Sequence, residues 1–183
     1  MNTTIQAILD RRSIRDFTAE GLTQVEIDTL IDVALASPTA MNRQQWVFRF
    51  ITDKDLIEQL NQAAQATFRE NGDQEVLERI ASRHTSIFYG APLVVMIAVP
   101  KAHDTAVDAG IAVQNLAIAA QSMGLGSCII GMASAAFSGP NGQDMLGRMD
   151  WPDDYEFVIS IAIGHPATSK EAHEEHPEKV QVI

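Results

Sequence analysis

Hydrophobic residues recur at helical spacing in several stretches of the chain. The first predicted helix covers residues 3–12, with Thr3 or Thr4 as its N-cap. A second helix opens with a capping box, in which the side chains of Thr23 and Glu26 each accept a hydrogen bond from the backbone N–H of the other residue. In all, the spacing predicts helices over residues 3–12, 23–37, 54–69, 73–88 and 104–123.

Continuous apolar runs, rather than helical stripes, mark the predicted strands. We expect strands over residues 46–52, 92–100, 127–132 and 156–164. The sequence predicts a loop over residues 138–144 and a helical turn over residues 143–149. The stretch 165–183 is a polar tail, although its last four residues, VQVI, alternate in a way that could add a fifth strand.

The helix predicted over residues 104–123 differs from the others. We expect Asp104 to cap it and Gly124 to end it, and no charged residue lies between Ala109 and Met123. A helix that is apolar on nearly every face is buried on nearly every side. The sequence therefore places this helix either at the centre of the domain or at an interface between subunits.

The order of these elements predicts an α+β fold with about four core strands. A chain of 183 residues is long enough to form one domain, over residues 1–183, with a substantial core. The net charge of −11 argues against nucleic acid as a partner, and no apolar run is long enough to span a membrane. Cys128 is the single cysteine, so we expect a buried, inert thiol in a cytoplasmic protein.

Three of the 13 basic residues fall within five positions, in DRRSIRDF, residues 10–17, here called the arginine segment. One interpretation is that Arg11, Arg12 and Arg15 complement the dipole of the preceding helix and pair with adjacent aspartates. The other is an anion site, because guanidinium groups and the Ser13 hydroxyl match the oxygens of a phosphate monoester. Position alone does not decide between them.

Two further loops carry candidate binding groups. The stretch SPTAMNRQQW, residues 37–46 and here called the amide loop, places Asn42 and Gln44 before a strand. Their amides suit a heterocycle with alternating carbonyl and N–H edges, or simply a polar turn. In GLGSCIIG, Gly124, Gly126 and Gly131 allow close approach of a flat ligand, and Gly131 is the best candidate.

The arginine segment, the amide loop and an apolar helix that runs into Gly-Leu-Gly-Ser occur here in one order. Together with IAIGHP near the C-terminus, this ordered set resembles the nitroreductase family of FMN-dependent oxidoreductases over nearly the whole chain. The resemblance implies an α+β sandwich with a central, mostly antiparallel sheet flanked by helices. It also implies a homodimer, with the long helix buried at the interface and two FMN sites there.

The resemblance further implies roles for particular residues. Arg11 and Ser13 match positions that hold the FMN phosphate, with a partial contribution from Arg12. Arg15 matches a basic position near the ribityl and pyrimidine side, where it could tune the flavin electrostatically. The remaining implied contacts are Asn42 and Gln44 at the pyrimidine edge, Ile130 and Gly131 near the flavin N5, and Lys179 near the phosphate.

The implied activity is ping-pong reduction of a nitroaromatic, quinone or related acceptor by NADH or NADPH, with no catalytic side chain and no metal. The same fold could instead support dehalogenation, enone or azo reduction, ring dehydrogenation, or flavin binding without catalysis. This chain departs from the family pattern in two places. Gln45 stands where proline is frequent, and Gln181 stands where a second tail cation is usual.

Overall fold

The four strands form one antiparallel sheet in the order β1-β2-β4-β3. We describe a computed structural model, which covers residues 2–101 and 105–183. The strands are β1 (Val47–Ile51), β2 (Leu93–Pro100), β3 (Gly126–Ile130) and β4 (Tyr155–Gly164). Each neighbouring pair is antiparallel, so the α+β class and the four core strands predicted from the sequence are confirmed.

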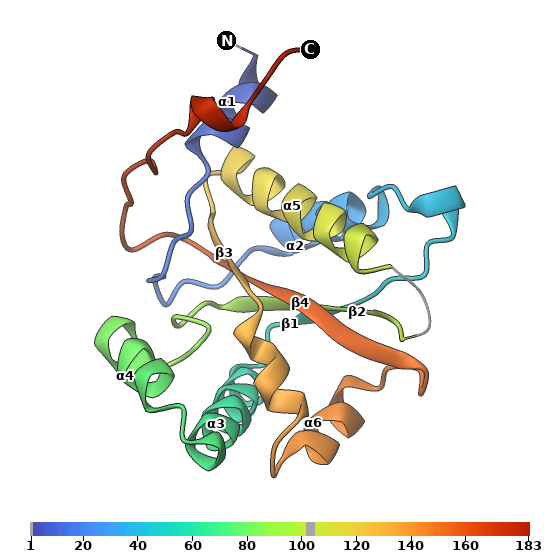
Figure 1. Cartoon of the computed structure of the whole chain (residues 1–183), viewed down its shortest axis with the longest axis vertical. Helices are drawn as coiled ribbons and strands as arrows, with labels where there is room; N and C mark the ends of the chain where they lie inside the picture. The colour runs from blue at the N-terminus through green and yellow to red at the C-terminus, as the bar shows by residue number, and fades with distance from the viewer. Residues whose placement is uncertain (1, 102–104) are drawn as a thin grey trace.

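Helices cover both faces of this sheet, as Figure 1 shows. The helices over one face are α1 (Thr3–Asp10), α2 (Gln24–Leu35) and α5 (Ala106–Ser122). The elements over the other are α3 (Lys54–Asn71), α4 (Gln74–Arg83), the short helix η2 (Met132–Phe137) and α6 (Gly142–Met149). Two further short helices, η1 (Ala40–Asn42) and η3 (Pro177–Lys179), lie in the amide loop and the tail.

Alternation along the strands divides the core in two. In the fully buried strand β2, Leu93 and Val95 pack with α5, whereas Val94 and Met96 pack with α3. This is the two-residue period of a strand covered on both sides. We call the α1–α2–α5 side the α5 face and the other side the α3 face.

Local capping explains where several helices begin. Asn2, rather than Thr3 or Thr4, caps α1, because its side chain accepts the Thr4 N–H at 2.8 Å. The capping box predicted at the start of α2 is present, with both reciprocal bonds. The expected Asp104 cap of α5 lies outside the described residues.

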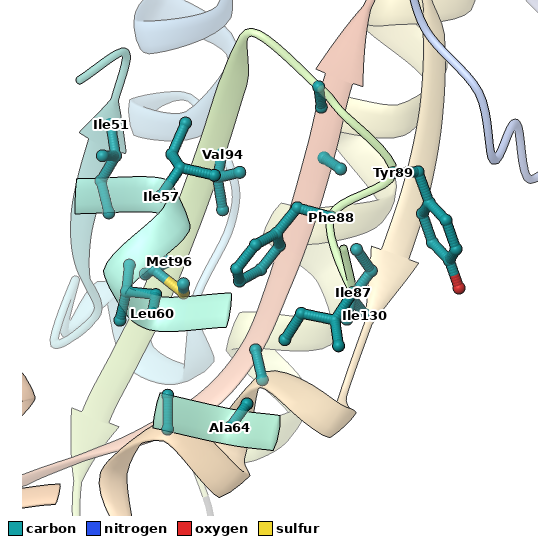
Figure 2. Packing of buried hydrophobic residues seen from close by; sticks show 14 of the residues in the cluster. Ile51, Ile57, Leu60, Ala64, Ile87, Phe88, Tyr89, Val94, Met96 and Ile130 are labelled. Atoms are coloured by element: carbon teal, nitrogen blue, oxygen red, sulfur yellow. The ribbon is translucent and has the colours of Figure 1, made fainter. Parts of the chain in front are cut away.

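The helix predicted over residues 73–88 ends at Arg83. Ile87 and Phe88 are fully buried, but they belong to a turn beneath α3 rather than to a helix, as Figure 2 shows. Side chains replace the missing helical acceptors: Asn61 Oδ1 accepts the Ile87 N–H at 3.0 Å, and Ser86 Oγ accepts the Phe88 N–H. Two buried apolar residues at these positions are compatible with either a helix or a turn, so the sequence pattern alone did not show where α4 ends.

Within one chain, α5 is not covered on every side. Ala109, Ala112 and Leu116 are buried against the sheet and its neighbours. On another side of the helix, Val107 is 63% exposed and Ile111 is 36% exposed. We call Val107, Gly110 and Ile111 the open stripe. Of the two locations that the sequence allowed for this helix, the open stripe favours an interface between subunits over the centre of the domain.

The tail does not add a fifth strand. Residues 180–183 are exposed and unpaired among the described residues, and Figure 1 shows them beyond α1, away from the sheet. A four-residue alternation forms a strand only where a sheet edge is available to it. None of the described helices is both long and apolar enough to cross a membrane.

Candidate functional site

The arginine segment is held against the ends of two strands by its main chain. The Ile14 N–H donates to Ser127 O at 2.9 Å, which pairs the segment with β3 in parallel. Further along, the Thr18 N–H donates to His165 O at 2.9 Å, just after β4. The segment thus crosses the end of the sheet, and Ile14 is buried in the core of the α3 face.

Two glycines make this crossing possible. Gly126 and Gly164 face each other across β3 and β4. A Cβ on Gly126 would lie 3.1 Å from Ile14, and a Cβ on Gly164 would lie 2.5 Å from Pro92 Cδ. The space beside Gly126 is therefore filled by the side chain of Ile14 and is not available to a flat ligand. Gly131 is different, because it is exposed and its nearest contact would be 3.7 Å away.

The arginines of the segment have different partners. The Arg12 guanidinium donates to Leu9 O at 2.7 Å and to Arg11 O at 2.9 Å, so it caps the end of α1. Among residues 2–101 and 105–183, no hydrogen bond or ion pair engages the guanidinium of Arg11 or Arg15. The neighbouring Asp10 instead accepts from Gln6 at 2.9 Å. The helix-capping interpretation therefore accounts for Arg12 but not for Arg11 and Arg15.

Positive charge gathers around β3 although the chain as a whole is acidic. Cys128 is buried, 3% exposed, and burial raises the pKa of its thiol. Four cations oppose this rise in pKa, namely Arg15, Lys170, Arg11 and Arg83. The expected burial of the thiol is confirmed, and a raised pKa favours the unreactive thiol over the thiolate.

Lys170 and Arg83 were missed by the sequence analysis. Lys170 belongs to the tail and Arg83 ends α4, so only the fold brings them near β3. Lys179, the tail cation that the resemblance implied, is exposed in η3. Nothing in the spacing of Lys170 or Arg83 distinguishes them from ordinary surface cations.

The remaining predicted residues lie on β3 and in the amide loop. Ile130 is buried at the end of β3, where its carbonyl accepts from Ser160 Oγ at 2.8 Å. Asn42 and Gln44 are exposed in the amide loop, and Gln44 Nε2 donates to Asn42 Oδ1 at 2.9 Å. Trp46, at the end of that loop, is buried in the core of the α5 face.

The two groups of candidate residues lie at opposite ends of α5 (Figure 1). The arginine segment pairs with Ser127, just past the C-terminal end of the helix, and the amide loop contacts its first turn. A 17-residue helix is about 25 Å long. Within one chain, this helix therefore separates the arginine segment from the amide loop.

Comparison with known sequences identifies the family. The sequence profile of the Nitroreductase family matches residues 8–165, which include the arginine segment, the amide loop and all four strands. The chain belongs to the nitroreductase family. The family resemblance inferred from the ordered motifs is thereby confirmed.

Several members of the nitroreductase family are similar to this chain over most of its length. The FMN reductase (NADPH) of Bacillus subtilis is 32% identical over 180 residues, which cover 91% of this chain and 67% of that protein. The NADPH-flavin oxidoreductase of Vibrio harveyi is 31% identical and covers 100% of this chain, which spans 73% of that protein. The chain thus has about two thirds to three quarters of the length of these nitroreductase relatives.

A solved nitroreductase structure has nearly the same fold. The nitroreductase with bound FMN from Desulfitobacterium hafniense superposes with a TM-score of 0.94 at 30% identity. The match covers 100% of this chain and 99% of that one. The central antiparallel sheet flanked by helices is therefore the nitroreductase fold, as the resemblance implied.

Proposed function

We propose that this chain is an FMN-dependent oxidoreductase that uses NADH or NADPH to reduce a nitroaromatic, quinone or related acceptor. The observation that carries the proposal is the pair of unengaged guanidinium groups, Arg11 and Arg15, on either side of the Ser13 hydroxyl. The similar proteins named FMN reductase and NADPH-flavin oxidoreductase support it. The FMN-bound neighbour with a TM-score of 0.94 supports the cofactor.

The residues present fit FMN. Arg11 and Ser13 would hold the phosphate through charge-assisted hydrogen bonds. Gly131 is exposed, and a Cβ there would meet only Ile159 Cδ1, at 3.7 Å, so a flat ring could lie against the main chain beyond Ile130. Lys170 and Arg83 add positive charge that acts on the same strand, and Lys179 is an exposed cation of the tail that would add to it.

FMN, when bound, would supply the hydride and electron chemistry, and the protein would bind and orient it. Arg15 would place a positive charge near the pyrimidine edge, where it favours extra negative charge on that ring. Asn42 and Gln44 would contact the pyrimidine edge with their amides. Arg12 would contribute through its main chain, since its side chain caps α1.

A second chain would complete the site. The arginine segment and the amide loop lie at opposite ends of α5 (Figure 1), but two chains packed against each other could bring one copy of each together. The open stripe of α5 is apolar and uncharged, as an interface between identical subunits requires. We therefore propose a homodimer of one-domain chains, residues 1–183, with two sites between the subunits. The lone Cys128 is consistent with a cytoplasmic location.

The first experiment is the visible spectrum of the purified protein, followed by anaerobic addition of NADH and then of NADPH. We expect flavin absorbance bands that bleach with at least one nucleotide. A colourless protein that takes up no added FMN would exclude the cofactor. Bands that persist with both nucleotides would exclude NAD(P)H-dependent reduction.

A matched set of variants tests the phosphate assignment. Arg11→Ala combined with Ser13→Ala should weaken FMN binding about 100-fold, because two charge-assisted contacts are lost. Arg12→Ala is the control, since its side chain engages α1, and it should change the FMN dissociation constant less than threefold. Equal effects of both variants would contradict the assignment.

Mixed dimers test whether each site uses both chains. A chain carrying R11A and S13A and a chain carrying N42A and Q44A would each bind little FMN alone. In a mixed dimer, one site combines the intact halves, so purified mixed dimers should bind up to one FMN per two chains. Mixed dimers without flavin would show that each site lies within one chain.

A further inference from the structure

The amide loop has a backbone that ordinary side chains seldom adopt. Met41, Asn42 and Gln44 all have positive φ, at 54°, 53° and 50°, although none is glycine. Residues in this region persist only where the surrounding structure holds them there. All three side chains are exposed, so burial of the loop itself does not hold it.

Part of the restraint comes from within the loop. Thr39 Oγ1 accepts the Gln44 N–H at 2.9 Å, and the Gln44 amide donates to Asn42 Oδ1 at the same distance. These bonds fix the shape of the loop. They do not fix its position relative to the rest of the molecule.

The position is set by two polar side chains of α5. Asp108 Oδ1 accepts the Ala40 N–H at 3.2 Å, and Asn115 Nδ2 donates to Ser37 Oγ at 3.0 Å. Asp108 and Asn115 are seven residues apart, or about two helical turns, so they project from the same face. The amide loop is thus attached to the helix on which the open stripe also lies.

Asp108 is costly for the fold to keep. It is 7% exposed on a mostly apolar helix, and it forms no ion pair within residues 2–101 and 105–183. Burying a carboxylate without a cation is unfavourable unless hydrogen bonds compensate. Two features of its place compensate: it lies in the first turn of α5, where the helix dipole favours a carboxylate, and its Oδ1 accepts the Ala40 N–H of the amide loop.

We propose that Asp108, together with Asn115, is a positioning residue that holds the amide loop where Asn42 and Gln44 can meet the ring of a bound flavin. The identity of the ligand, a flavin, depends on the proposed function. The hydrogen bonds that hold the loop are contacts within the protein and do not depend on it. Asp108 acts through the loop backbone and does not touch the ligand itself.

Binding of FMN and of riboflavin, measured by titration of flavin fluorescence, tests this role. Riboflavin has the ring but no phosphate. Asp108→Ala should weaken both ligands about tenfold and by the same factor, whereas Arg11→Ala should weaken FMN alone. Asp108→Asn should stay within threefold of the wild type, because the amide oxygen can still accept the Ala40 N–H.

Thr23→Ala is the matched control. It removes the cap of α2, which precedes the same loop, but no contact with α5. It should leave both dissociation constants unchanged. Wild-type binding by Asp108→Ala, weakening of FMN alone, or an Asp108→Asn variant as weak as Asp108→Ala would overturn the proposal.

Amide hydrogen exchange of the wild-type protein gives a second test that needs no flavin and no variant. The Ala40 N–H is bonded to Asp108, whereas the neighbouring Met41 N–H has no partner among the described residues. We expect exchange at Ala40 to be at least tenfold slower than at Met41. Equal rates would overturn the anchoring contact, and a wild type that binds no FMN would instead overturn the proposed function.

Discussion

A single chain covers the apolar surface on the two faces of the sheet to different degrees. On the α3 face, helix α3 buries Ile57, Leu60 and Ala64 and presents polar residues outward. On the α5 face, Val107 and Ile111 remain exposed, and so do apolar residues of α1 and α2. The first face is complete in one chain, and the second is not.

The candidate binding residues lie close to the incomplete face. The amide loop is attached to α5, and the arginine segment leaves α1 to cross the end of the sheet. Both groups of candidate residues therefore begin on the incomplete face. A partner that covers this face would also be in a position to complete a binding site.

The largest effect should come from a charge in the open stripe. Ile111→Glu would bury an unpaired carboxylate in the proposed interface, at a cost of about 3 kcal/mol or about 100-fold in the dimer dissociation constant. Sedimentation equilibrium measures it. Gln143→Glu, at an exposed position on α6, is the control and should leave the dimer intact. A dimeric Ile111→Glu variant would place the interface elsewhere.

The crossing at the end of the sheet should be the next most sensitive point. Gly164→Ala would put a Cβ 2.5 Å from Pro92 Cδ, so the free energy of unfolding should fall by about 2 kcal/mol. Gly147→Ala in α6 meets nothing within 4 Å and should be neutral or stabilising. Urea denaturation compares the two, and equal stabilities would contradict the close approach.

Arg15 should tune the bound flavin more than it holds it. Arg15→Ala should make the FMN midpoint potential about 30 mV more negative, because a positive charge near the reduced ring is lost; for two electrons this is about 1.4 kcal/mol. Redox titration measures the shift, with Arg12→Ala as the control. An unchanged potential would remove this role from Arg15.

The smallest effect concerns the capping box of α2. Hydrogen bonds from Thr23 lower the pKa of Glu26 below its ordinary 4.5. The stabilisation is therefore present above pH 4.5 and is lost as the pH falls through the folded-state value. Glu26→Gln should cost about 0.5 kcal/mol at pH 7 and progressively less in acid. In a Thr23→Ala background the backbone N–H of residue 23 still donates to the carboxylate but the hydroxyl does not, so the pH-dependent part should shrink without vanishing.

Features that depend on local chemistry could be predicted from the sequence. Thr23 and Glu26 are three residues apart, so their capping box needs no knowledge of the fold. The run over residues 92–100 predicted the buried strand β2 for the same reason. The ordered motifs indicated the family, and the family fold followed from it.

Features that depend on distant contacts could not be predicted in this way. The end of α4 at Arg83 depends on Asn61 of α3, because its side-chain oxygen accepts a hydrogen bond from the Ile87 N–H. The influence of Lys170 on the buried Cys128 thiol depends on where the fold places the tail. The role of Asp108 depends on a loop 68 residues away in the sequence.

The separation of the two groups of site residues along α5 has a consequence for how the protein would behave as its amount changes. A site assembled from two chains exists only to the extent that the chains have met. Mass action then links cofactor retention to protein concentration, and flavin in turn stabilises the dimer. A dilute preparation should lose its yellow colour before it unfolds, and added FMN should reverse that loss.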